Sequence, residues 1–175
     1  MHFDIQLGFT SIPAEAKITC REAVRGIALN QEKQILMVHN SRGDYKFPGG
    51  GVEAGEDHVT ALLREFREET GYTISESIRL LGVIVETKED SYDPDAYFVM
   101  KSYYYCCQTI GEPVEQCLDA YEQELHFEPV CLPVEEAYLT NQQLLDSEAE
   151  DMNGWVERET MVLKLLIDHS AVNQY

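Results

Sequence analysis

A run of glycines at residues 49–51 leads through a short polar loop into a segment with helical periodicity, and this pairing constrains the fold most. The apolar residues of segment 57–70 recur at i, i+3, i+4 and i+7, at Val59, Leu62, Leu63 and Phe66. Such a stripe predicts a helix that packs one face against other elements. Asp57 suits the N-terminal cap of this helix, and Gly71 suits a left-handed C-terminal cap.

Three glutamates, Glu65, Glu68 and Glu69, lie at i, i+3 and i+4 and share one face of this helix. At 100° per residue they centre about 115° from the apolar stripe, so the helix can pack while the carboxylates point into a cleft. Like charges this close cost about 0.2–0.5 kcal/mol per pair, and a bound cation offsets that cost. Carboxylate oxygens suit Mg²⁺. A solvated acidic face is the alternative interpretation.

The charge of the chain limits its partners. It has 13 basic and 32 acidic residues, a formal net charge of −19. This charge repels nucleic acids and anionic membranes, so we expect neither as a partner, and a small phosphorylated substrate needs cations to approach. The sequence shows no secretory signal and no apolar run of membrane-spanning length. Five cysteines without a CxxC pair argue against a disulfide framework or a zinc site. We expect a cytoplasmic protein with reduced thiols, and a homodimer remains open.

The order of predicted elements indicates an α/β fold with a mixed β-sheet sandwiched between α-helices. The predicted strands are 21–30, 34–39, 45–47, 79–87, 97–108 and 124–132, and the later helices are 134–146 and 155–168. The first two strands are separated by residues 31–33 and read as a hairpin. No internal repeat or linker interrupts the chain, so we expect one domain over residues 1–175.

Residues 50–72 resemble the Nudix box, G-x5-E-x7-R-E-U-x-E-E-x-G-U, in which U is a bulky apolar residue. The matching residues are Gly50, Glu56, Arg64, Glu65, Phe66, Glu68, Glu69, Gly71 and Tyr72. All seven fixed letters occur at the required spacing, which chance produces in about one chain in a million. The resemblance implies a Nudix fold and a Mg²⁺- or Mn²⁺-dependent enzyme. Such an enzyme hydrolyses a pyrophosphate bond in a nucleoside diphosphate linked to another moiety.

The resemblance also implies roles for individual residues. It makes Glu65, Glu68 and Glu69 the catalytic metal ligands, with a backbone carbonyl of Gly49 or Gly50 as a further ligand. Supporting residues that hold the loop and the helix together are Glu56 and Arg64. Glu68 or Glu69 is expected to help activate the attacking water.

Other candidates lie outside the box. Family members can use a glutamate elsewhere as the base, and Glu122 and Glu124 are the candidates, although exposed polar positions fit them too. Arg25 and Lys46 are the cations best placed for phosphate, although a surface or sheet-face role fits each equally. For base stacking the tyrosines at 103–105 are candidates, but strand positions in the core or on the surface explain them more simply.

The identity of the substrate stays open within this interpretation. A nucleoside triphosphate, a nucleotide sugar and a dinucleotide all fit the implied chemistry. The alternative to an enzyme is a catalytically silent Nudix domain that acts as a nucleotide-binding sensor or interaction module. Such domains usually lose glutamates of the box, whereas this chain retains Glu56, Glu65, Glu68 and Glu69.

Overall fold

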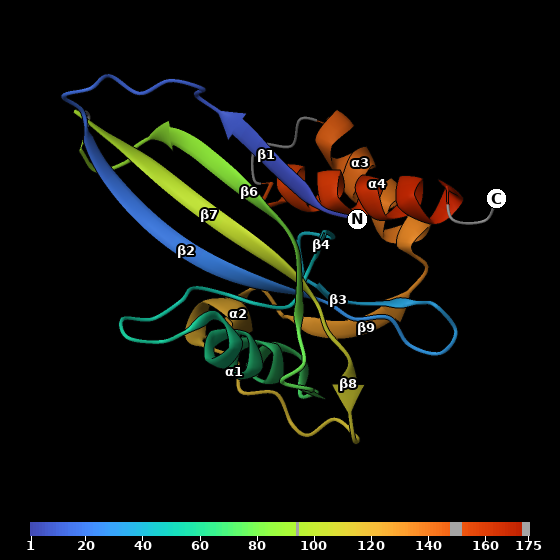
Figure 1. The fold of residues 1–175 in the computed structure, drawn as a ribbon. Helices are drawn as coiled ribbons and strands as arrows, with labels where there is room; N and C mark the ends of the chain where they lie inside the picture. The colour runs from blue at the N-terminus through green and yellow to red at the C-terminus, as the bar shows by residue number, and fades with distance from the viewer. Residues whose placement is uncertain (94, 148–151, 173–175) are drawn as a thin grey trace.

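The computed structural model describes residues 1–93, 95–147 and 152–172. Its helices are α1 (His58–Thr70), α2 (Ala120–Glu124), α3 (Val134–Ser147) and α4 (Val156–Val172). Its strands are β1 (Phe3–Gly8), β2 (Lys17–Ile27), β3 (Ile35–His39), β4 (Tyr45–Lys46), β5 (Thr73–Ile74), β6 (Arg79–Glu89), β7 (Ala96–Cys106), β8 (Thr109–Ile110) and β9 (Glu128–Leu132). Figure 1 shows the long strands crossing the molecule with α1 on one side and α3 and α4 on the other.

The largest sheet has the strand order β1-β6-β7-β2. The central strands β6 and β7 run antiparallel, while β1 on β6 and β2 on β7 run parallel, so the sheet is mixed. The strands predicted at 79–87 and 97–108 are confirmed as β6 and β7. Strand β1 is absent from the predicted elements, although Phe3, Ile5 and Leu7 alternate with polar residues as a half-buried strand requires.

A second sheet has the order β4-β3-β9 and is antiparallel, and β5 and β8 form a short separate pair. The turn predicted at residues 31–33 is present, since the Asn30 amide donates to the Gln34 carbonyl over 2.9 Å. The hairpin prediction is confirmed next to this turn, where Leu29 bridges Ile35 and the Leu36 amide donates to the Ala28 carbonyl over 3.0 Å. Farther from the turn the two strands diverge into different sheets, since β2 pairs with β7 while β3 pairs with β4 and β9.

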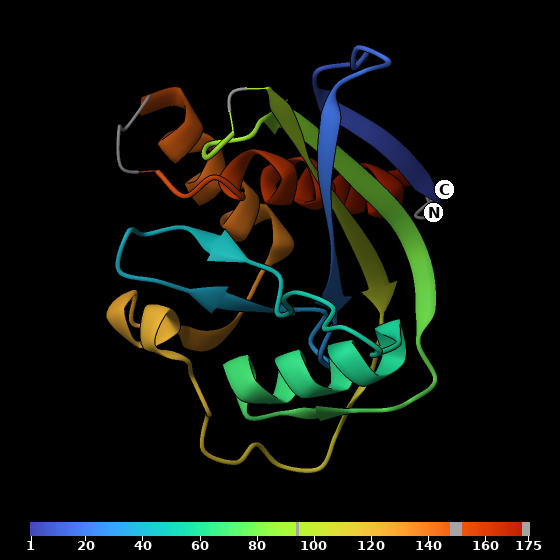
Figure 2. The ribbon, with the colours of Figure 1, turned by 90° about the vertical axis from the view of Figure 1, so that its left-hand side faces the viewer.

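Two of the three apolar cores lie on opposite sides of strand β3, and the third contains Val38, Leu125 and Phe127. Ile35 and Met37 face the core that includes Val162 and Leu163 of α4, whereas Leu36 faces the core around α1. Neighbouring side chains of a strand point to opposite sides, so the continuous apolar run of β3 is explained by cover on both faces. In Figure 2 the strands lie between α1 below and α3 and α4 above. The predicted α/β fold with a mixed sheet between helices is confirmed.

The predicted cap residues of α1 are confirmed. The Asp57 side chain accepts the Thr60 amide over 2.8 Å, and Gly71 has a φ of 74°, in the left-handed region. Helices α3 and α4 match the predicted segments 134–146 and 155–168. Within the described residues, no helix has the length and apolar character needed to cross a membrane.

The strand predicted at 124–132 is wrong at its beginning, because residues 120–124 form helix α2 and β9 starts at Glu128. A capping box explains the helix. The Asp119 side chain accepts the Glu122 amide, and the Glu122 side chain accepts the Asp119 amide, both over 2.8 Å. The spacing Asp119-x-x-Glu122 is the sequence signal that identifies this helix.

Candidate active site

A cavity of about 560 Å³ lies where the glycine loop, α1, α2 and the segment before α4 meet. It is lined by Arg25, Lys46, Gly49, Gly50, Gly51, Glu53, Arg64, Glu65, Glu68, Glu69, Cys117, Leu118, Asp119, Tyr121, Glu122, Phe127 and Trp155. Predicted residues of the glycine loop and of α1 line this cavity. It also contains residues between 117 and 155 that the sequence motifs do not connect with them.

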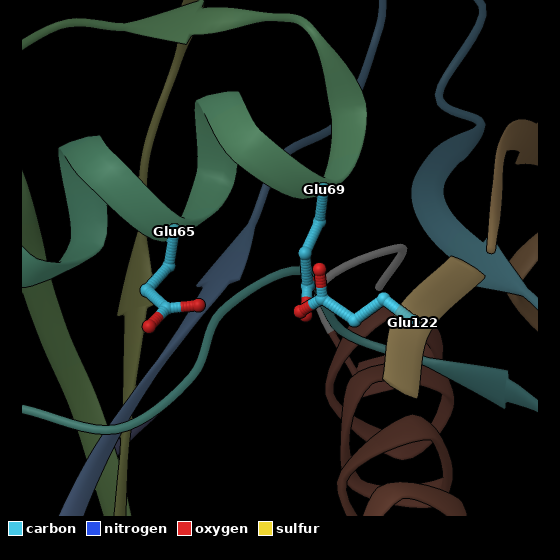
Figure 3. Close-up of side chains that lie close together, drawn as sticks. All are labelled: Glu65, Glu69 and Glu122. Atoms are coloured by element: carbon cyan, nitrogen blue, oxygen red, sulfur yellow. The ribbon is translucent and has the colours of Figure 1, made fainter. Parts of the chain in front are cut away.

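Three carboxylates form the acidic centre of this cavity. Glu65 and Glu69 of α1 and Glu122 of α2 have ligand atoms that all lie within 4.8 Å of one another, and we call them the carboxylate cluster. Figure 3 shows Glu122 reaching toward Glu69 from a different element. Burial raises the pKa of Glu65 and raises the pKa of Glu122 to about 7, and the charge of Glu69 adds to both shifts.

Glu69 is held at the bottom of the cavity by two donors. Lys46 forms an ion pair with its Oε1, and the Gly49 amide donates to its Oε2 over 2.9 Å. Both side chains of the ion pair are buried. A buried carboxylate requires such partners, because an unpaired charge in the interior is costly. In this structure Lys46 is therefore the ion-pair partner of Glu69.

The glycine loop is held by hydrogen bonds from residues of β2 and β4. The Gly49 carbonyl accepts hydrogen bonds from Arg25 and, over 3.2 Å, from Lys46, while the Gly50 carbonyl accepts the Val24 amide over 2.9 Å. Arg25 of β2 is buried and lines the cavity, so it does not lie on the outer surface of the protein. The carbonyls predicted as metal ligands thus have internal donors here.

Arg64 ties the loop to the helix. Its guanidinium donates to both carboxylate oxygens of Glu56, over 3.0 and 2.8 Å, and to Glu65 over 2.7 Å. It also donates to the Gly51 carbonyl over 3.2 Å. A planar guanidinium suits this arrangement because it offers several donors in fixed directions. These contacts are those expected of residues that support the loop and the helix.

Two of the glutamates predicted as metal ligands or as the base lie outside the carboxylate cluster. Glu68 lines the cavity with a side chain that is 38% exposed and accepts one hydrogen bond from Arg64 over 3.3 Å. Glu124, at the end of α2, is exposed and does not line the cavity. Of the two residues of α2 that are candidates for the general base, only Glu122 points toward α1.

The aromatic residues of the cavity differ from those considered in the sequence. Tyr104 lies in the apolar core, and the tyrosines at 103 and 105 do not line the cavity. Tyr121, Phe127 and Trp155 do line it. No local motif links these three residues to the glycine loop, so only their spatial convergence reveals them.

The donor set suits a hard divalent cation. Carboxylate oxygens from Glu65, Glu69 and Glu122 converge closely enough to share one ion or a pair of ions. Mg²⁺ and Mn²⁺ favour such oxygen ligands. A cation at this position also reduces the repulsion between the three carboxylates and any approaching phosphate.

Comparison with known proteins places the chain in a family. The NUDIX domain model matches residues 20–164. A protein named "Putative ADP-ribose pyrophosphatase YjhB" from Bacillus subtilis is 34% identical over 95 residues, which cover 54% of this chain and 44% of that protein. An RNA pyrophosphohydrolase from Pelagibacter ubique is 31% identical over 68 residues, covering 37% of this chain and 43% of that protein. The chain thus matches less than half the length of either curated relative.

The fold is shared with solved structures. A NUDIX hydrolase from Nitrosomonas europaea superposes with a TM-score of 0.55 and 16% sequence identity, covering 85% of this chain and 90% of that one. At this level of identity the superposition bears on the fold alone. The family model spans both the glycine loop and the acidic helix, together with α2 and most of α4. The chain therefore belongs to the Nudix family.

Proposed function

We propose that this protein is a hydrolase that uses Mg²⁺ or Mn²⁺ to cleave a phosphoric anhydride bond in a small nucleotide-linked substrate. The convergence of Glu65, Glu69 and Glu122 within 4.8 Å, beside the glycine loop, is the observation that carries the proposal. The names of the relatives support it, since an ADP-ribose pyrophosphatase, an RNA pyrophosphohydrolase and an 8-oxo-dGTP diphosphatase share this bond type and differ in the nucleotide.

In this proposal α1 supplies the metal ligands. Glu65 and Glu69 hold the cation, and Glu68, at the edge of the cavity, completes the set from the same helix. When bound, the metal neutralises the pyrophosphate and lowers the pKa of a coordinated water. Arg64 and Glu56 keep Glu65 in place against the loop. Lys46 pairs with Glu69 and holds its side chain in the buried position.

We assign the general base to Glu122 on geometric grounds. It reaches the cluster from α2, whereas the ligands come from α1, and residues of both helices line the cavity. Its Oε2 accepts the Asp119 amide, which fixes the side chain. A water in the cavity would transfer its proton to a carboxylate oxygen of Glu122 as its oxygen attacks phosphorus, while the bond from that phosphorus to the bridging oxygen breaks and the other phosphate leaves.

The test is phosphate release from a panel of nucleotides, with alkaline phosphatase as the coupling enzyme where the product is a monoester. We expect turnover with Mg²⁺ or Mn²⁺ and none in EDTA. Turnover that persists in EDTA contradicts the metal dependence. Nucleotide binding without turnover of any substrate supports the silent sensor instead of the enzyme.

Helix α2 offers a matched pair of variants for the base. Glu122→Gln keeps an acceptor for the capping box and is expected to lower kcat about 10²–10⁴-fold. Glu124→Gln changes the same residue type on the same helix, outside the cavity, and should leave kcat unchanged. Equal kcat values for both variants contradict the assignment.

A further inference from the structure

We propose that the ammonium group of Lys46 is an internal counter-ion, which a divalent cation displaces when it binds the carboxylate cluster. The inference rests on the proposed function, because it concerns the metal site of the proposed hydrolase. It follows from the atoms that Lys46 contacts, since these are atoms that the metal is expected to use.

The Lys46 side chain lies between two expected metal ligands. Its Nζ forms an ion pair with Oε1 of Glu69 and donates to the Gly49 carbonyl over 3.2 Å. Among the described residues these are the only hydrogen-bond or ion-pair partners of the ammonium group. A carboxylate oxygen and a carbonyl oxygen are also the ligand types that Mg²⁺ binds. The ammonium group therefore occupies the oxygen ligands that a divalent cation requires.

The two ligands have little capacity for another partner. The Gly49 carbonyl accepts hydrogen bonds from both Arg25 and Lys46, and a carbonyl oxygen has two lone pairs. The other carboxylate oxygen of Glu69, Oε2, accepts the Gly49 amide over 2.9 Å. A metal can bind the Gly49 carbonyl only if one of its two donors leaves. An ammonium group and a divalent cation also repel each other strongly when both contact one buried carboxylate.

Lys46 is the donor that can leave. Arg25 is also paired with the buried Glu159, at 3.7 Å, which keeps its guanidinium in place. The lysine stem is flexible, and the ring centres of Phe127 and Trp155 lie 4.8 and 5.8 Å from Nζ. Aromatic rings attract a cation, so the ammonium group keeps a favourable environment in the cavity after it leaves Glu69.

Arg64 also contacts the carboxylate cluster but is held differently. It donates to Glu65 over 2.7 Å, and it is also bound to both carboxylate oxygens of Glu56 and to the Gly51 carbonyl. Those partners lie outside the cluster and keep Arg64 in place whether or not a metal is bound. Lys46 has no such anchor among the described residues, so the exchange is specific to it.

Isothermal titration calorimetry with Mn²⁺ alone tests the exchange without any turnover. Lys46→Met should bind Mn²⁺ about 10-fold more tightly than the unmodified protein, because no internal cation has to be displaced. Lys164→Met loses the same charge from an exposed pair outside the cavity and is the matched control. A Mn²⁺ affinity in Lys46→Met that is no higher than in Lys164→Met overturns the proposal.

Lysine labelling tests the exchange in the unmodified protein, which also covers the case in which Lys46→Met does not fold. Sulfo-NHS-acetate is added in EDTA or in Mg²⁺, and peptide mass spectrometry follows each lysine. Lys46, with a side chain only 6% exposed, should react slowly in EDTA and severalfold faster in Mg²⁺. Lys164, which is 51% exposed, should react equally in both. Labelling of Lys46 that is equal or slower in Mg²⁺ overturns the proposal.

The two proposals can fail separately. If Mn²⁺ binding and Lys46 labelling respond as expected but no substrate is hydrolysed, the enzyme is contradicted and the exchange stands. If Mg²⁺ supports hydrolysis while Lys46→Met has unchanged Mn²⁺ affinity and Lys46 labelling does not respond to Mg²⁺, the exchange alone is contradicted.

Discussion

Lys46 and Glu69 form an ion pair beneath the glycine loop, with side chains only 6% and 2% exposed. The pair joins β4 to the end of α1 and so links the second sheet to the acidic helix. Lys46 also donates to the Gly49 carbonyl. The buried ammonium group of Lys46 therefore holds the glycine loop and α1 together at the bottom of the cavity.

Replacing Lys46 by an uncharged residue should destabilise the protein strongly. Lys46→Met removes the ion-pair partner of the buried Glu69 and leaves it only the Gly49 amide, so we expect a loss of about 3–5 kcal/mol in the free energy of unfolding. Urea denaturation without divalent metal measures it. Lys164→Met breaks the exposed pair with Asp168 and serves as the control, with an expected loss far smaller than that of Lys46→Met. A similar loss in both variants would show that burial of the Lys46 pair is unimportant.

Alanine substitutions in the glycine loop should have three different outcomes. At Gly50 a Cβ would collide only with the end of the Glu65 side chain, which can move, so stability should fall by about 1 kcal/mol or less while activity falls about 100-fold. At Gly49 the Cβ would meet the Val24 backbone and φ is 137°, so we expect a stability loss of about 1–3 kcal/mol. Gly51 has open space and should tolerate alanine. Thermal melts and kcat for all three variants test this order.

Divalent metal should stabilise the protein through the carboxylate cluster. At 100 times its Kd, Mg²⁺ or Mn²⁺ adds about 2.7 kcal/mol, which corresponds to a rise of about 5–10 °C in Tm. EDTA should reverse the rise. Glu65→Gln should reduce it, because one charged ligand is lost, while Glu124→Gln should not. A full rise in Glu65→Gln contradicts the role of this residue as a ligand.

The cysteines should differ in reactivity toward iodoacetamide. Burial raises the pKa of Cys107 to about 12, so its thiol stays protonated at pH 9, whereas Cys20, Cys117 and Cys131 are exposed. The unfolded chain loses this proton near the ordinary pKa of about 8.5, so the Cys107 contribution lowers stability as pH rises from about 9 toward 12. Peptide mass spectrometry after labelling at pH 9 should find Cys107 unmodified until urea is added. Rapid labelling of Cys107 in the folded protein contradicts the prediction.

Local patterns account for much of the observed structure. The apolar stripe and caps of α1 follow from residues within about 15 positions of one another. Short-range features such as these depend on helix geometry and backbone hydrogen bonds, which neighbouring residues determine. The predicted hairpin forms only near its turn, and the pairing of β2 with β7 was not predicted because sheet order depends on contacts made far along the chain.

The sequence by itself determined the acidic helix, the glycine loop that precedes it and their resemblance to one family. Helical periodicity placed three glutamates on one face, but it could not say which of them point inward. Tertiary structure decided that Glu65 and Glu69 are joined by Glu122 while Glu68 stays at the edge, and that Trp155 lines the same cavity. The physical reason is that these residues meet only when α1, α2 and the segment before α4 pack around the second sheet, and no local pattern encodes that packing.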